Sequence, residues 1–143
     1  MTTICWDGRT LAADKRSTIG GLYRTGTKIF RVGSSLVGYA GSGAQCSEML
    51  AWARGGFRKA AFPEAQRDTE NSIVLLVIRP HGVIQIYEHS PCAIEYEDKQ
   101  FAIGSGRDYA LAAMRLGKNA RDAVLLAAEF DPGTGNGVDT LTL

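Results

Sequence analysis

The sequence has few of the residues on which common catalytic and structural sites depend. It contains two histidines, His81 and His89, and three cysteines with no CxxC spacing in 143 residues. An odd and scattered set of cysteines argues against a disulfide framework and against a zinc site, and it suits a reducing cytoplasm. If the chain is an enzyme, we expect its general base to be something other than histidine.

An excess of charge of one sign and long apolar runs are also missing. Sixteen basic and fifteen acidic residues give a net charge of +1, which argues against a nucleic-acid partner. The longest strongly apolar run, residues 73–78, is too short to cross a bilayer. The first residues lack the basic start and apolar stretch of a signal peptide. We therefore expect a cytoplasmic protein with no membrane partner.

The residues present suit one globular domain spanning residues 1–143. The hydrophobic fraction of 45% is enough for a core, and this length is typical of one domain. Apolar and β-branched runs between turn signals predict hairpins and strands. The expected strands are 2–6, 10–13, 28–32, 35–40, 73–79, 83–88, 101–103 and 138–143.

Three helices are expected among these strands. The first spans about 44–62, with Pro63 preventing its continuation. In the second, which Gly117 ends, the shared face is expected to hold Tyr109, Ala112, Ala113 and Leu116. The third has Asn119 as N-cap and an inner stripe of Ala120, Ala123, Val124 and Ala127. Because strands and helices come in clusters, this order favours α+β layers of antiparallel sheet.

The second residue offers a chemistry that needs no histidine. If Met1 is removed, Thr2 carries both a hydroxyl nucleophile and an α-amine whose reference pKa is about 7.7–8.0. That amine can act as the general base for its own hydroxyl. On these residues alone, however, a chain that merely starts Met-Thr-Thr is the simpler interpretation.

Five further motifs, in order along nearly the whole chain, change that balance. They are Leu11-Ala-Ala-Asp14-Lys-Arg16 with Thr18, Lys28-Ile29, Tyr39-Ala40-Gly41, Gly104-Ser105-Gly106, and Asp131 with Thr134-Gly135 before Gly137-Val-Asp139. Together with Thr2-Thr-Ile they resemble proteasome β-type peptidases, especially their HslV-like bacterial and phage-borne relatives. The resemblance implies a four-layer αββα sandwich of the N-terminal-nucleophile (Ntn) hydrolase type. One helix, 44–62, stands where the family has two, so the second helix of the first helical layer is expected to be reduced or missing.

The resemblance also implies a threonine-type endopeptidase with a defined catalytic set. Lys28 would lie beside the Thr2 hydroxyl, Asp14 would orient Lys28, and the Gly41 amide would form the oxyanion hole. The residues that hold the α-amine and its proton-relay water would be Ser105, Asp131 and Thr134, the last in place of the family's usual serine. Taken alone, Lys28 and Asp14 would suggest a surface salt bridge, Ser105 a helix N-cap and Asp131 a turn residue.

A peptide or unfolded protein is the substrate that the resemblance implies. Arg16 and Thr18 belong to the segment that lines the family's cleft, and Thr18 would bind an extended peptide by strand addition. Tyr39, Gly43 and Cys46 are candidates for the walls of a side-chain pocket. No cofactor or metal is required. The resemblance further implies a homo-oligomer, which in the family is a ring often fed by an ATP-driven unfoldase. Because the helical layer that helps to build subunit contacts in the family is reduced here, the sequence predicts neither a ring nor its symmetry.

Two alternatives belong to other functional classes. The first is a catalytically silent subunit of the same fold with an assembly role, although such a subunit has no need of Thr2, Asp14 and Lys28 together. The second is a nucleotide-binding module, since residues 41–46 partly imitate a GxGxxG turn. Cys46 stands at the third glycine position, and the strands pair as hairpins, so this reading is the weaker one. Calcium binding at residues 131–139 fails because glycines stand where oxygen ligands are needed.

Overall fold

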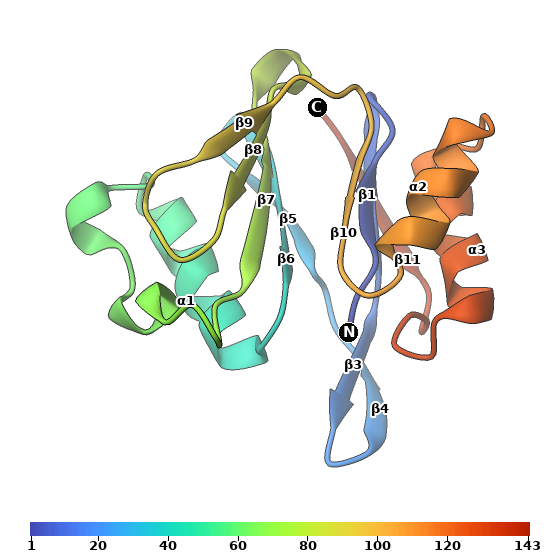
Figure 1. Cartoon of the computed structure of the whole chain (residues 1–143), viewed down its shortest axis with the longest axis horizontal. Coiled ribbons are helices and arrows are strands. Elements are labelled where there is room, and N and C mark those ends of the chain that lie inside the picture. The colour runs from blue at the N-terminus through green and yellow to red at the C-terminus, as the bar shows by residue number, and fades with distance from the viewer.

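Two antiparallel β-sheets lie face to face, and helices cover both outer faces (Figure 1). The computed structural model describes residues 1–143. One sheet, called the β1 sheet, has the order β10-β1-β2-β11 and contains β1 (Ile4–Trp6), β2 (Thr10–Asp14), β10 (Phe101–Ile103) and β11 (Val138–Thr142). The other, called the β6 sheet, has the order β5-β6-β7-β8-β9 and contains β5 (Ile29–Val32), β6 (Ser35–Ala40), β7 (Val74–Ile78), β8 (Ile84–Tyr87) and β9 (Ile94–Tyr96).

The helices complete a four-layer αββα sandwich. Helix α1 (Gly43–Arg54) packs on the β6 sheet, while α2 (Arg107–Arg115) and α3 (Ala120–Phe130) cover the β1 sheet (Figure 1). Single 3-10 turns lie at Lys59–Ala61, Glu64–Arg67 and Pro80–Gly82. No helix has the length and apolar character needed to cross a membrane. The expected fold class and layer order are therefore confirmed.

Alternation along the strands produces three separate cores. In β1, Ile4 and Trp6 point between the sheets, whereas Cys5 points to the helices on the other face. The core between the sheets is rich in large aliphatic residues, while the one under α2 and α3 consists mostly of alanine, which lets these helices lie close to the β1 sheet. The third core lies between α1 and the β6 sheet. The strands that carry the N-terminal residues are thus held from both sides.

The outer layer over the β6 sheet is shorter than expected. The sequence predicts a helix to about residue 62, but α1 ends at Arg54, because Gly55 and Gly56 follow it. Aromatic side chains from α1 and from the segment that follows it cover the rest of this face of the sheet. Trp52 is the centre of this cluster, with edge-on contacts to Phe57, Phe62 and Tyr87 at centroid distances of 5.0–5.2 Å.

The prediction for the buried face of α2 is wrong in register. Ala110, Ala113 and Met114 face the sheet, whereas Tyr109 is 43% and Leu116 86% exposed. The small residues at 110 and 113 allow close packing of the helix on the sheet. Tyr109 instead stacks on Phe130 of α3, with ring centroids 5.4 Å apart. In α3 the predicted stripe is buried and Asn119 caps the helix through the Asp122 N–H at 2.8 Å, as expected.

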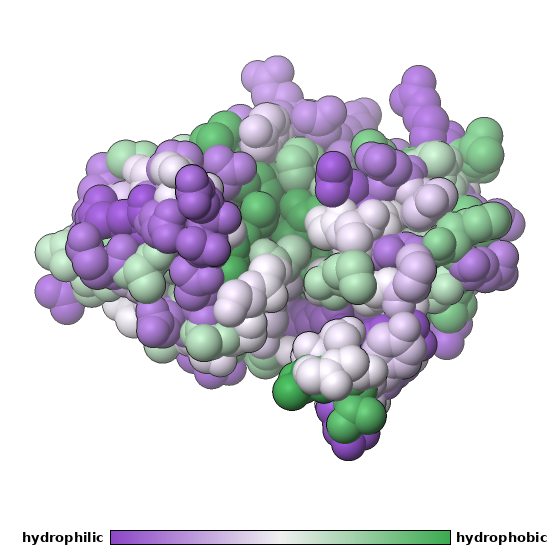
Figure 2. Space-filling model, turned by 60° about the horizontal axis from the view of Figure 1, so that its bottom comes forward, coloured by the Kyte–Doolittle hydropathy of each residue, from purple (hydrophilic) through white to green (hydrophobic).

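Two structural features have no counterpart among the expected strands. A hairpin of β3 (Arg16–Ile19) and β4 (Leu22–Thr25) turns at Gly20-Gly21 and projects from the sandwich near the N-terminus (Figure 1). Strand β9 adds an exposed edge to the β6 sheet. Figure 2 shows apolar residues at the protruding tip of the hairpin, where Ile19 and Leu22 are 67% and 56% exposed.

Candidate active site

A lysine, an aspartate and a threonine meet at the end of the sandwich where the chain begins. Lys28, next to the start of β5, places its Nζ 2.9 Å from Thr2 Oγ1 and 2.8 Å from Asp14 Oδ1 at the end of β2. The Lys28 side chain is 8% exposed and the Asp14 side chain is fully buried. The pair is therefore not a surface salt bridge, and the ammonium can act on the Thr2 oxygen.

Backbone amides hold the Asp14 carboxylate in place. Oδ1 accepts the Thr3 N–H at 2.9 Å, while Oδ2 accepts the N–H groups of Arg16 at 3.2 Å and Gly135 at 3.1 Å. With Lys28 included, four donors serve this one carboxylate, which is how a buried charge is tolerated. Burial lowers the pKa of Lys28, and the hydrogen bond and charge of Asp14 oppose that shift.

A second carboxylate serves the Thr2 nitrogen through a serine. The Thr2 N–H donates to Ser105 Oγ at 3.1 Å, and Ser105 Oγ donates to Asp131 Oδ2 at 2.6 Å. Asp131 also accepts Thr134 Oγ1 at 2.6 Å and the Gly133 N–H at 3.2 Å. Burial alone would raise the pKa of Asp131, but these hydrogen bonds lower it below its ordinary value. Ser105 does not cap α2, whose first turn has no side-chain cap.

Thr3, which the sequence analysis did not single out, joins the two carboxylate systems. Its amide donates to Asp14, and its Oγ1 lies 2.6 Å from Thr134 Oγ1. Since the Thr134 hydroxyl proton goes to Asp131, the Thr3 hydroxyl must be the donor in that contact. Thr3 is fully buried. The only signal in the sequence is a second threonine beside the first, which does not reveal a contact 131 residues away.

Gly41 lies between β6 and α1, on the rim of the same cleft. Its φ of +140° is a conformation that side chains disfavour, and a Cβ there would lie 2.5 Å from Ile73 Cγ2. Its N–H donates to no backbone or side-chain acceptor of the chain. The amide is thus available to a bound group.

The cleft at this end has a volume of about 570 Å³. The residues that line it include Met1, Thr2, Arg16, Thr18, Lys28, Tyr39, Gly41, Gly43 and Cys46. Thr18 is exposed on β3, and Gly43 opens α1. Tyr39 donates its hydroxyl to the Thr27 carbonyl at 3.1 Å. Burial raises the pKa of Cys46 to about 12, so the thiol stays protonated and is no rival nucleophile.

All twelve site residues expected from the sequence lie in or beside this cleft. Arg16 lines it, and its guanidinium donates to Pro132 O and Asn136 Oδ1 in the loop before β11. Met1 remains attached, so the Thr2 nitrogen is a peptide nitrogen that stands in for the free α-amine. The Met1 side chain lies against Gly133, and its carbonyl accepts Lys28 Nζ at 3.4 Å.

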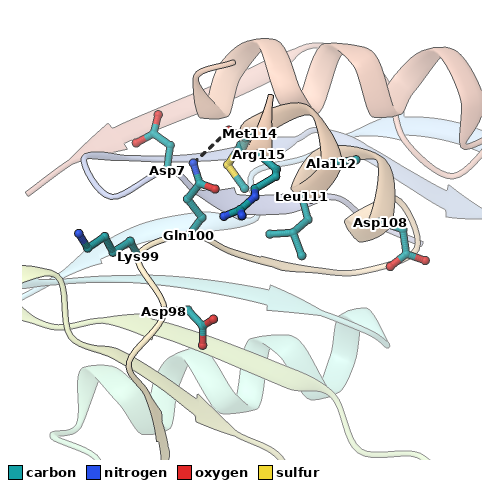
Figure 3. A pocket seen from close by; sticks show the side chains of 9 residues that line it. All are labelled: Asp7, Asp98, Lys99, Gln100, Asp108, Leu111, Ala112, Met114 and Arg115. Atoms are coloured by element: carbon teal, nitrogen blue, oxygen red, sulfur yellow. Dashed lines mark hydrogen bonds between the residues drawn. The ribbon is translucent and has the colours of Figure 1, made fainter. Parts of the chain in front are cut away.

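A larger hollow of about 930 Å³ lies elsewhere, between α2 and the segment that joins β9 to β10 (Figure 3). Charged side chains on its rim, among them Asp98, Lys99 and Arg115, are exposed. Gln100 is tied to the Met114 carbonyl at 3.1 Å. Every buried polar side-chain atom of the chain has a partner, so this hollow contains no buried side-chain donor or acceptor that is left unpaired.

Comparison with known proteins identifies the fold. No family model matches the sequence, and no curated protein matches it. Among solved structures, BPH of Thiobacillus denitrificans in complex with epoxomicin matches with a TM-score of 0.73 and 24% identity, over 100% of this chain and 98% of that one. BPH of the same organism in a second structure gives 0.71 and 25% identity, over 99% and 96%. Eukaryotic HslV from Trypanosoma brucei gives 0.72 and 23% identity, over 98% of each chain.

These matches cover essentially the full length of both partners. The chain therefore has the HslV-like Ntn-hydrolase fold from end to end, and the resemblance seen in the motifs is confirmed at the level of the fold.

Proposed function

We propose that the chain is a threonine-type endopeptidase in which Thr2 becomes the nucleophile once the Met1–Thr2 bond is cleaved. The observation that carries the proposal is the position of Lys28 Nζ, 2.9 Å from Thr2 Oγ1 and 2.8 Å from a fully buried aspartate. A lysine in that position has a chemical use, because it stabilises an alkoxide and favours the neutral, basic form of a nearby amine.

The reaction begins when Thr2 Oγ1 adds to a peptide carbonyl carbon and its proton passes to the freed α-amine. The carbonyl oxygen becomes an oxyanion, and the Gly41 N–H donates to it. A donor of this kind contributes about 2.7–4 kcal/mol of transition-state stabilisation. The protonated amine then gives its proton to the leaving nitrogen, the C–N bond breaks, and an ester to Thr2 remains.

Water completes the cycle. The α-amine takes a proton from a water molecule, the resulting hydroxide adds to the ester carbonyl, and the C–O bond to Thr2 breaks as the oxygen regains its proton. Ser105 and Asp131 orient the amine in both halves, since the Thr2 nitrogen already donates to Ser105 Oγ at 3.1 Å. In this arrangement the α-amine is the general base and no histidine is needed. Neither His81 nor His89 lines the cleft.

The rival function is a silent subunit with the same fold. The polar contacts favour activity, because the desolvation energy of a buried lysine–aspartate pair offsets much of its attraction, so the pair contributes little to the stability of the fold. A silent chain would have no use for an ammonium 2.9 Å from the Thr2 hydroxyl, since three backbone amides already hold the Asp14 carboxylate. The retained set is therefore better explained by chemistry.

The decisive test uses protein expressed with a cleavable N-terminal leader, whose removal leaves Thr2 as the first residue; this protein is called the Thr2-first form. We expect this form to hydrolyse peptide–fluorophore substrates, and Thr2→Ala to abolish hydrolysis. Thr140→Ala, a threonine-to-alanine change at an exposed position of β11, is the matched control and should keep full activity. The form that retains Met1 should be inactive.

A ligand of a structural neighbour separates a silent subunit from an enzyme with an unknown cleavage preference. Epoxomicin, the compound in complex with one of the BPH structures, is the probe. The mass of the protein after incubation should rise by one epoxomicin in the Thr2-first form and not in Thr2→Ala. A Thr2-first protein that neither cleaves peptides nor gains this mass would favour the assembly role.

A homo-oligomer acting on unfolded protein is part of the same proposal. Outward-facing apolar side chains at the ends of α2 and α3, among them Leu116 directly after α2 and Phe130 in α3 at 86% and 60% exposure, offer a surface for contacts between copies. An ATP-driven unfoldase as a further partner rests on the family resemblance alone. Sedimentation velocity would show whether the chain assembles; a monomer at micromolar concentration would contradict this part.

A further inference from the structure

Arg16, at the start of β3, is hydrogen-bonded to the loop of residues 131–137, which joins α3 to β11. Its Nε donates to Asn136 Oδ1 at 2.9 Å and its Nη1 donates to the Pro132 carbonyl at 2.8 Å. These two acceptors stand on either side of Thr134 and Gly135. One planar guanidinium therefore fixes both ends of the segment that follows Asp131.

The loop is shaped to receive this side chain. A Cβ at Gly135 would lie 2.5 Å from Arg16 Nη2 and 2.6 Å from Cζ, so only glycine lets the guanidinium lie against the loop backbone. The same loop presents Asp131 to the Thr2 nitrogen through Ser105, and Thr134 of this loop donates to the same carboxylate. A shift of the loop would consequently move the carboxylate that orients the amine.

The projecting hairpin holds Arg16 from the other side. The Tyr23 ring of β4 lies 4.0 Å from Arg16 Cζ, a cation–π contact. Thr25, which pairs with Arg16 across the hairpin, accepts Asn136 Nδ2 at 2.9 Å through its Oγ1. Hairpin, arginine and loop thus form one connected unit, here called the Arg16 clamp: Arg16, Tyr23, Thr25, Pro132, Gly135 and Asn136.

We propose that Arg16 is a positioning residue that holds the 131–137 loop in register with the Thr2 amine, rather than a contact for substrate. The proposal rests on the proposed peptidase function. It replaces the substrate-binding role expected from the sequence, because two edges of the guanidinium are already bonded to the loop. A positioning role affects the catalytic step, whereas a binding role affects substrate affinity.

The first test compares Arg16→Met with Arg24→Met in the Thr2-first protein. Both changes remove one positive charge from the same hairpin, but Arg24 is exposed and donates only to the neighbouring Tyr23 carbonyl. We expect Arg16→Met to lower kcat about ten- to a hundredfold with KM nearly unchanged, and Arg24→Met to match the wild type. A rise in KM with an unchanged kcat would overturn the proposal.

Asn136→Gly addresses the concern that Arg16→Met disturbs folding. Asn136 has a φ of +64°, which glycine adopts freely, so this variant removes the side-chain contacts to Arg16 and Thr25 without backbone strain. It should lower kcat in the same direction but by less than Arg16→Met. Arg16→Met and Asn136→Gly together should cost less than the product of their separate effects, because they break the same clamp.

Amide hydrogen exchange supplies a readout that does not depend on activity. In the 131–137 loop, the Thr134 N–H donates to Asp131 O and the Gly135 N–H donates to Asp14 Oδ2. Both amides should exchange faster in Arg16→Met and keep wild-type rates in Arg24→Met. Unchanged exchange in Arg16→Met would refute the clamp even if activity fell. An inactive wild type would instead refute the proposed function, while the exchange rates would still decide whether Arg16 holds the loop.

Discussion

Asp14→Asn is expected to destabilise the chain more than Lys28→Met, although both break the same ion pair. The reason is the set of donors around the carboxylate. Asp14 accepts the Lys28 ammonium and three backbone N–H groups, from Thr3, Arg16 and Gly135. An asparagine can keep Oδ1 as an acceptor for Lys28 and Thr3, but its amide nitrogen then faces the N–H groups of Arg16 and Gly135.

The magnitudes follow from counting the lost bonds. Asp14→Asn removes two hydrogen bonds to a charged group, each contributing about 1.5–3 kcal/mol, so its cost is roughly 3–6 kcal/mol. Lys28→Met removes one such bond and leaves three amides on the carboxylate. It also removes an ammonium whose pKa is lowered by burial, and which is therefore disfavoured in its charged form. We expect about 1–3 kcal/mol, below the 3–5 kcal/mol typical of breaking a buried pair.

Urea unfolding of the form that retains Met1 measures both values at pH 7, without interference from proteolysis. Lys15→Met is the matched control, since the Lys15–Asp139 bridge is about a third exposed and should contribute under about 1 kcal/mol. A Lys28→Met variant as unstable as Asp14→Asn would refute the reasoning. It would mean that the ammonium, and not the backbone amides, holds the carboxylate in the folded chain.

Three further outcomes test other parts of the site. Thr3→Val removes the hydroxyl that donates to Thr134 and should cost about 1–2 kcal/mol in urea unfolding, while Thr3→Ser stays near the wild type. The pKa of Asp131 is lowered in the folded chain, so near and below about pH 4 the unfolded chain binds more protons than the folded one. Stability in thermal unfolding should therefore fall as the pH drops through the native pKa of Asp131, and in Asp131→Asn this acidic pH dependence of stability should be weaker. Gly41→Ala forces a Cβ against Ile73 and should cost about 1–3 kcal/mol, together with a loss of kcat in the Thr2-first form because the Gly41 amide is displaced from the oxyanion; since alanine keeps the backbone N–H, full activity there would contradict that displacement.

The sequence indicated most of the fold because its strands and its last helix carry strong patterns. The run 73–78 is almost entirely buried in and beside β7, as its composition predicted. Strands β3, β4 and β9 were missed because they have only three or four residues each and are largely exposed, so no run of buried apolar positions marks them. In α2 the alanines give little contrast between faces, and the face was placed one position away from Ala110 and Met114.

For the site, the motifs pointed to residues but not to their directions. Lys28 and Asp14 do meet at Thr2, at distances that no spacing in the sequence could supply. The contacts of the Arg16 guanidinium and of the Thr3 hydroxyl could not be predicted, because both are made to a loop more than 110 residues further along the chain. Such contacts arise only when β2 and β11 pair and bring the two segments side by side.

The short outer layer and the complete site are compatible because they depend on different cores. Thr2, Asp14 and Lys28 are held by β1, β2 and β5, whose large side chains pack between the two sheets. The aromatic cluster around Trp52 covers only the outer face of the β6 sheet. Removing a helix there leaves the facing strands in place, as long as the aromatic rings keep water from the sheet. What the shortened layer does change is the outer surface beside α1, and not the geometry around Thr2.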